Sequence, residues 1–207
     1  MRWIYFIFVL SGFSALLYQV VWQRSLFAIY GINVESVTVI VTAFMLGLGV
    51  GSLVGGEVSK VPSRPALLLF SMVELGIGVF GFLSLPLFRA VGSMTLGLSP
   101  LPTFLITFLL VLFPTTLMGA TLPLLVADGV RTSGNVGRAV GVLYFVNTLG
   151  SGVAALASVV ILMGRLGQTR TVYLAAAINL TVSAIAYLQH RRRTTAEASV
   201  AAPSLST

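Results

Sequence analysis

Long apolar runs separated by short polar segments dominate the chain. The runs are each about 20 residues or longer and cover residues 4–29, 35–57, 66–89, 101–127, 138–164 and 171–189. They do not alternate between apolar and polar positions, as the strands of a membrane barrel would, and each is long enough to cross a bilayer as a helix. The pattern therefore predicts an all-α polytopic membrane protein with six transmembrane helices.

The segments between these runs are short and rich in helix-breaking residues, so one six-helix transmembrane domain is expected over residues 1–189. The first run is longer than the apolar core of a signal peptide, and we interpret it as an uncleaved first span. After His190 the sequence RRRTTAEASVAAPSLST is small and polar, without periodicity. Such a segment buries little apolar surface, so residues 190–207 are predicted to form a disordered, basic and polar tail.

Lysine and arginine are distributed unequally between the two sides that six spans define. With the N-terminus inside, the inner side holds Arg2, Lys60, Arg64, Arg131, Arg138, Arg191, Arg192 and Arg193, and the outer side holds Arg24, Arg89, Arg165 and Arg170. Cytoplasmic loops of membrane proteins carry an excess of these residues. Both termini are therefore predicted to be cytoplasmic, in a multi-pass protein surrounded by the lipid bilayer.

The composition narrows the classes of function. Of the 207 residues 57% are hydrophobic and 8% are charged, which leaves little chain for a soluble catalytic domain. The net charge is +7, but the basic residues lie singly between apolar runs or in one cluster beside the last span, so no nucleic-acid partner is expected. There is no cysteine and one histidine, and no catalytic or metal-binding motif converges. The sequence thus predicts neither an enzyme nor a cofactor or metal site.

The second run carries glycines four residues apart, at Gly47, Gly51 and Gly55. On a helix these positions share one face. A glycine inside a helix costs about 0.5–1 kcal/mol, but in lipid a face without side chains lets two helices approach backbone to backbone. We predict that this glycine face packs against another helix, within the chain or in a second copy. The glycines of residues 66–89 and 138–164 are the expected partners, and a sliding interface used in a conformational cycle is the alternative.

Glu74 is the one acidic residue well inside a predicted span. An ionisable side chain in the hydrocarbon is costly and is a functional-site hypothesis by default. Counted along the helices, Asn147 lies at nearly the same depth, followed by Thr148. We predict that these three residues contribute to one site that binds a small solute or a proton. A protonated Glu74 that hydrogen-bonds a neighbouring helix as structural glue is the alternative.

Two further pairs of polar residues lie towards the outer side. Gln19 and Gln23 are four residues apart on one face of the first predicted helix, so they are candidates for binding a polar solute. Membership of an aromatic and polar belt at the membrane surface is the alternative. Arg24 and Glu35 flank the turn GINVE and are predicted to form an interfacial ion pair.

Four segments, in this order, resemble the membrane region of the bacterial fused major-facilitator/spermidine-synthase-like proteins: SGFSALLYQVVWQR, AFMLGLGVGSLVGG, FPTTLMGATLPLL and GRAVGVLYFVNTLGSGVAAL. The resemblance covers roughly residues 10–185. It implies six helices similar to the N-terminal half of a major-facilitator transporter, in the bacterial inner membrane. Members of that family usually carry an aminopropyltransferase-like domain after the membrane helices. Because this sequence contains no aminopropyltransferase motif, that activity is not expected of it.

The first hypothesis for function is a half-sized, major-facilitator-like transporter or transporter-like module for a small solute, with a cationic, polyamine-type molecule as one candidate. A complete transporter of that kind encloses its pathway between two six-helix halves, so a homo-oligomer or a second membrane subunit is expected. The second hypothesis is a non-transporting membrane anchor or assembly subunit for a separately encoded, soluble aminopropyltransferase-like enzyme or a larger complex. An inactive remnant is a third.

Overall fold

The computed structural model describes residues 2–30, 34–61 and 63–201, and within them the chain is almost entirely helical. The long helices are α1 (Arg2–Tyr30), α2 (Val34–Ser59), α3 (Ala66–Met94), α4 (Pro100–Ser133), α5 (Val136–Ala157) and α7 (Gly167–Ala201). A π-helical turn (Ser158–Leu162) and the short α6 (Met163–Arg165) extend α5. In the described part, six helices are long and apolar enough to cross a membrane. The prediction of an all-α polytopic fold is confirmed, and the protein is an integral membrane protein.

The last helix is longer than the sequence pattern indicated. It begins at Gly167 and continues through the arginine cluster to Ala201. Residues 190–201 are therefore helical, and the predicted disordered tail has to be corrected in this part. The reason is local: the stretch contains good helix formers such as arginine, alanine and glutamate, and it meets no proline before Pro203. Residues 202–207 lie outside the described part.

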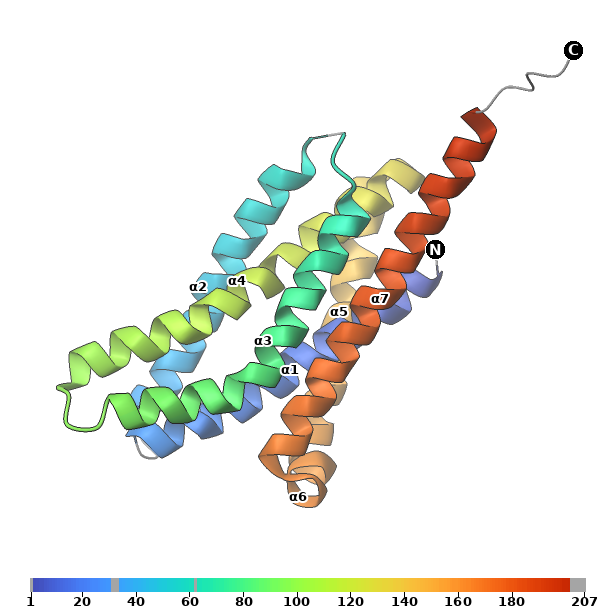
Figure 1. The fold of residues 1–207 in the computed structure, drawn as a ribbon. Helices are drawn as coiled ribbons and strands as arrows, with labels where there is room; N and C mark the ends of the chain where they lie inside the picture. Colours follow the sequence, from blue (N-terminus) through green and yellow to red (C-terminus); the bar gives the residue numbers. More distant parts are fainter. Residues whose placement is uncertain (1, 31–33, 62, 202–207) are drawn as a thin grey trace, which may run out of the picture.

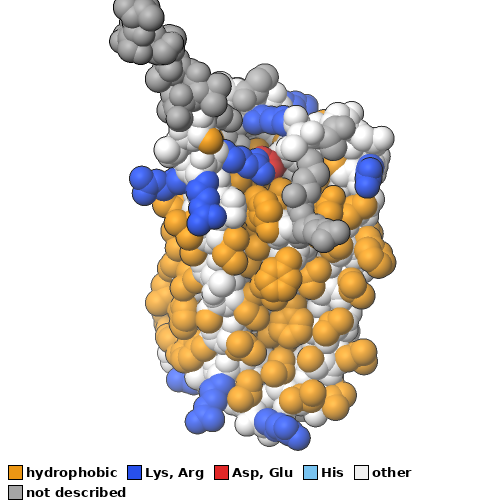
Figure 2. All heavy atoms as spheres, turned by 90° about the vertical axis from the view of Figure 1, so that its right-hand side faces the viewer, with side chains coloured by type: hydrophobic (Ala, Val, Ile, Leu, Met, Phe, Trp, Pro, Cys, Tyr) orange, Lys and Arg blue, Asp and Glu red, His pale blue; other side chains and the backbone are white. Residues whose placement is uncertain are grey.

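The surface has the distribution of side chains expected in a bilayer. On the face that Figure 2 displays, a broad band of apolar side chains covers the middle of the bundle, and lysine and arginine lie at its two ends. At about 1.5 Å per residue, 35-residue α7 is about 52 Å long, whereas the hydrocarbon core of a bilayer is about 30 Å thick. The last turns of α7 accordingly project beyond the other helices at the end of the bundle where α1 begins (Figure 1).

The helices pack mainly in three pairs, α1 with α5, α2 with α4, and α3 with α7. In the first pair the two backbones touch. A Cβ atom added to Gly12 of α1 would lie 2.9 Å from the carbonyl carbon of Asn147 on α5. A Cβ added to Gly150 of α5 would lie 2.9 Å from the carbonyl carbon of Val9. Both distances are shorter than van der Waals contact, so only glycine fits at these two positions.

The glycine face of α2 lies against α4. A Cβ added at Gly47, Gly51 or Gly55 would lie less than 3.0 Å from atoms of Thr115, Thr116 and Ala120, respectively. The expected partners among the glycines of α3 and α5 are therefore corrected, because the small residues that receive this face belong to α4. The sequence TTLMGA places Thr115 and Gly119, and Thr116 and Ala120, four residues apart. This spacing gives α4 a small-residue face of its own.

The contacts of α2 with α4 repeat those of α1 with α5. A Cβ added to Gly119 would lie 2.9 Å from the carbonyl carbon of Leu48, and one added to Gly51 would lie 2.8 Å from that of Thr116. In both helix pairs, each glycine thus faces the carbonyl group of the residue three positions before the partner's glycine. The first half of the chain (α1 to α3) and the second half (α4 to α7) therefore make equivalent contacts, in which the first helix of each half packs against the second helix of the other.

Candidate functional site

The side chain of Glu74 is completely buried at the junction of α1, α3 and α7. Ser11 Oγ on α1 donates a hydrogen bond of 2.5 Å to Glu74 Oε1. Asn179 Nδ2 on α7 donates another of 2.5 Å to Glu74 Oε2. The carboxyl group therefore connects three helices. It also joins the two halves of the chain, because Asn179 belongs to the second half.

No cation neutralises this carboxyl group among the described residues. The two ion pairs found there join Lys60 to Glu57 and Arg193 to Asp128, and both lie away from Glu74. Two hydrogen bonds from neutral groups do not cancel a full charge, and an unpaired carboxylate in a low dielectric costs several kcal/mol or more. A proton or a bound cation is the physical means by which such a group is neutralised. We therefore expect Glu74 to hold a proton or a small cation in this conformation.

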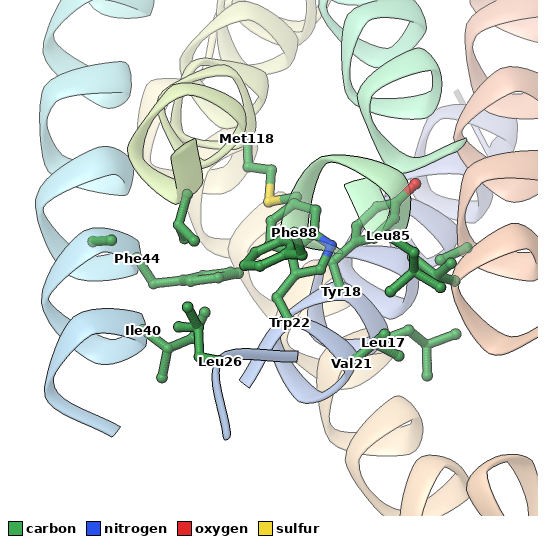
Figure 3. Packing of buried hydrophobic residues seen from close by; sticks show 14 of the residues in the cluster. Leu17, Tyr18, Val21, Trp22, Leu26, Ile40, Phe44, Leu85, Phe88 and Met118 are labelled. Carbon is green, nitrogen blue, oxygen red and sulfur yellow. The ribbon is translucent and has the colours of Figure 1, made fainter. Parts of the chain in front are cut away.

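Glu74 lies between two apolar clusters of the bundle core. One contains Phe8 and Phe70, whose rings meet edge to face at 6.4 Å. The other contains Tyr18 and Trp22, which stack with ring centroids 5.0 Å apart (Figure 3). Trp22 also contacts Phe44, Phe80 and Phe88. In this conformation the apolar clusters cover Glu74, so a solute would reach it only after the helices move.

Three buried polar atoms near this region have no hydrogen-bond partner among the described residues. They are Asn179 Oδ1, Tyr18 Oη and Trp22 Nε1. The Tyr18 hydroxyl lies against Gly81, where a Cβ would lie 2.7 Å from the ring atom Cζ. Because buried polar groups are normally paired, these three atoms are exceptions within the described part of the chain.

Asn147 belongs to α5, which packs against the face of α1 that carries Val9 and Gly12 and not against the face that carries Ser11. It is half-buried, and its Nδ2 donates a hydrogen bond of 3.3 Å to the carbonyl oxygen of Phe8. Glu74 therefore takes its amide partner from Asn179 and not from Asn147, and the expected meeting of Glu74 with Asn147 is corrected. The reason is the pairing of the helices, which places α5 beside α1 and α7 beside α3. Thr148 is exposed on the outward face of α5.

The remaining predicted residues lie outside the Glu74 cluster. Gln19 and Gln23 are half-buried on α1. They are offset around the helix from Ser11, Tyr18 and Trp22. They therefore do not share the face of α1 that packs against Glu74. Arg24 is exposed. The side chain of Glu35 lies outside the described part of the chain, and with it the predicted ion pair.

Sequence reasoning missed two of the residues that hold Glu74, Ser11 and Asn179. A signal existed for both. Ser11, Ser14, Tyr18 and Ser25 recur at helical spacing along one face of the first span, a polar line within an apolar run. Asn179 is the one amide well inside the last span, and such residues hydrogen-bond across helices in membranes.

No group of three or more histidine, cysteine, aspartate or glutamate residues that could hold a metal ion occurs in the described ranges. Comparison of the chain with protein-family models, with curated proteins and with solved structures finds no match.

Proposed function

We propose that the protein is a half-sized, major-facilitator-like transporter module of the bacterial inner membrane, with both termini in the cytoplasm, and that Glu74 is its proton- or cation-binding group. The single observation that carries this proposal is the fully buried Glu74, which pairs with no basic residue in the described part of the chain and which hydrogen-bonds to Asn179 of the other half. A change in the charge of this carboxyl group would act directly on the contact between the two halves. That is the kind of coupling a transport cycle requires.

The internal equivalence of the two halves supports the transporter reading. Many secondary transporters are built from repeats of three or more helices that make corresponding contacts, and major-facilitator halves contain such 3+3 repeats. Here the glycine contacts of α1 with α5 correspond to those of α4 with α2. An anchor that only tethers another protein has no need of such an arrangement.

The outward faces of α2 and α5 support pairing with a second copy or another membrane subunit. Gly49 on α2 and Gly141 and Gly152 on α5 have nothing within 4 Å of the position of a Cβ. Thr148 is exposed on the same helix as the last two. Small and hydroxyl-bearing side chains are enriched where membrane helices meet. A six-helix module would gain the missing wall of a solute pathway by such pairing.

The solute class follows from the charge of the site. Among the acids whose side chains the structure describes, Glu57 and Asp128 are paired with basic side chains, and Glu74 is the one that remains for a positively charged ligand. A proton and a cationic amine of the polyamine type both fit this charge. Gln19, Gln23 and Asn147, all half-buried, are the polar groups on α1 and α5 that a solute would meet once the helices move.

Uptake of radiolabelled spermidine into proteoliposomes, with a pH gradient imposed, tests the proposal. Wild-type protein is expected to accumulate spermidine, and the Glu74→Gln variant is expected to lose at least about nine-tenths of this uptake while keeping its fold. Glu57→Gln is the matched control, because Glu57 is an exposed acid at the end of α2. Equal uptake by wild type and Glu74→Gln would remove Glu74 from the proposal, and no uptake above empty liposomes would contradict transport of this solute.

A second candidate function is a membrane anchor for a separately encoded aminopropyltransferase-like enzyme. The observation in its favour is the extension of α7 beyond the bundle, which carries the exposed Arg191 and Arg192. Native mass spectrometry in mild detergent distinguishes the two functions. A tightly held foreign subunit in the absence of uptake would favour the anchor, and two copies of this chain alone would favour the transporter.

A further inference from the structure

Arg131 in the last turns of α4 holds the connection between α2 and α3 against the bundle. Its Nη1 donates a hydrogen bond of 2.9 Å to the carbonyl oxygen of Arg64, and its Nη2 donates bonds of 3.2 and 3.1 Å to those of Ser59 and Val61. Carbonyl groups are neutral, so these bonds fix the guanidinium without cancelling its charge. They also use three of its five N–H donors, which leaves two for a ligand.

A groove of about 590 Å³ opens beside this arginine. Its rim carries two basic side chains, Arg131 and Lys60. Its wall is apolar and is formed mainly by Pro123, Val126 and Val130 of α4. Pro123 precedes Arg131 by two helical turns, so the wall runs for about 12 Å from the basic rim towards the middle of the bilayer.

The positive charge of this rim is only weakly compensated. Lys60 forms an ion pair of 2.5 Å with Glu57, but both side chains are about 70% exposed, and exposed pairs contribute little. Arg131 takes part in no ion pair among the residues that the structure describes. The rim lies at the end of the bundle where the α2–α3 connection meets the end of α4, at the level where lipid headgroups surround a membrane protein.

We propose that this groove is a binding site for one anionic phospholipid. The phosphate lies between Lys60 and Arg131, and an acyl chain follows the apolar wall of α4. The groove offers a fixed guanidinium with free donors and a flexible lysine, which suit a headgroup phosphate. Its apolar wall, about 12 Å long, suits the hydrocarbon chain joined to that phosphate. A soluble anion would use the rim and leave the wall uncovered, which is why the occupant is a lipid.

Bound lipid acts as a second clamp on the α2–α3 connection in this site. Arg131 already contacts three carbonyl groups there, and a phosphate beside Lys60 would tie the two basic side chains together. The site stands apart from the Glu74 cluster and does not depend on transport. Its test can therefore fail or succeed independently of the proposed function.

Native mass spectrometry of the purified full chain, titrated in detergent with phosphatidylglycerol or phosphatidylcholine, tests the proposal. Wild-type protein is expected to retain one phosphatidylglycerol with at least about tenfold preference over phosphatidylcholine. Each of Arg131→Gln and Lys60→Gln is expected to weaken this binding by about fivefold, the effect of one basic charge. Arg192→Gln, which removes an exposed arginine at the same end but outside the groove, is expected to change it less than twofold.

A variant that fills the groove separates a specific site from diffuse attraction to a basic surface. Ala127 lines the wall, and Ala127→Phe adds bulk there without changing any charge. It is expected to reduce the amount of retained phosphatidylglycerol at least about fivefold, which equals the effect expected from the loss of one basic side chain. Because Arg131→Gln also releases the α2–α3 connection, Lys60→Gln and Ala127→Phe keep the test decisive if that variant fails to fold. Equal binding of the two lipids, or equal effects of Arg192→Gln and Lys60→Gln, would overturn the proposal.

Discussion

Ser71 on α3 and Ser183 on α7 hydrogen-bond to each other's backbone. Ser71 Oγ donates a bond of 2.9 Å to the carbonyl oxygen of Ser183, and Ser183 Oγ donates a bond of 2.7 Å to that of Ser71. The two hydroxyl oxygens are 3.2 Å apart. This reciprocal pair joins the last helices of the two halves, about one turn from the Glu74–Asn179 bond. The polar contacts between α3 and α7 are thus concentrated at one level of their interface.

Replacing either serine by alanine is expected to weaken this interface. Ser71→Ala and Ser183→Ala should each lower the free energy of unfolding by about 0.5–1 kcal/mol, since hydrogen bonds between membrane helices average about 0.6 kcal/mol. Because each hydroxyl donates to a backbone carbonyl that the other substitution leaves in place, the two losses should be nearly additive in the double variant. Ser93→Ala is the control, because Ser93 is exposed and bonds only to Ala90 of its own helix. If neither change cost more than Ser93→Ala, the reciprocal bonds would not stabilise this interface.

The contact of Gly51 with α4 predicts a large effect of a single methyl group. Gly51→Ala would place a Cβ 2.8 Å from the carbonyl carbon of Thr116, where the obstacle is backbone and cannot rotate away. We expect destabilisation of about 1–3 kcal/mol, the usual range for overpacking. Thermal unfolding in detergent measures it. Gly56→Ala on the same helix has nothing within 4 Å of its Cβ and should be nearly neutral, so similar effects of the two changes would refute the packing described here.

The unpaired hydroxyl of Tyr18 predicts that its removal is tolerated. A buried polar group without a partner costs about 1–3 kcal/mol, so Tyr18→Phe should leave stability unchanged or raise it by up to about that amount. The exposed Tyr144 offers the matched control, Tyr144→Phe. If Tyr18→Phe proved clearly destabilising in the same unfolding assay, the hydroxyl would have to be bound to water or to a solute.

The six spans and the small-residue contact of α2 could be read from the sequence because both depend on local patterns. An apolar run longer than 20 residues has one stable state in lipid, and glycines at Gly47, Gly51 and Gly55 share a face whatever surrounds them. The partner of that face could not be read in the same way. Several helices carry small residues, and the choice of α4 follows from how all six helices pack together.

In the candidate site, likewise, one residue could be identified from the sequence and its partners could not. Glu74 stands out in the sequence because a carboxyl group inside an apolar run is costly wherever it points. Its partners did not stand out, because counting residues gives the depth of a side chain and not the direction in which it faces. Asn147 and Asn179 both lie well inside their spans, and only the pairing of α3 with α7 selects Asn179. The helix over residues 190–201 could not be predicted from the sequence pattern either. A polar segment without periodicity can still continue a helix that neighbouring turns have started.

The proposed function requires that Glu74 takes up and releases a proton or cation inside the bilayer and so acts on the contact between the two halves. Infrared difference spectra of the protein in lipid, recorded across a pH change, measure this directly through the carbonyl stretch of a protonated carboxyl group. We expect one such band that titrates in wild type and in Glu57→Gln and is absent from Glu74→Gln. A wild-type spectrum without a titrating band that depends on Glu74, both with and without spermidine, would contradict it.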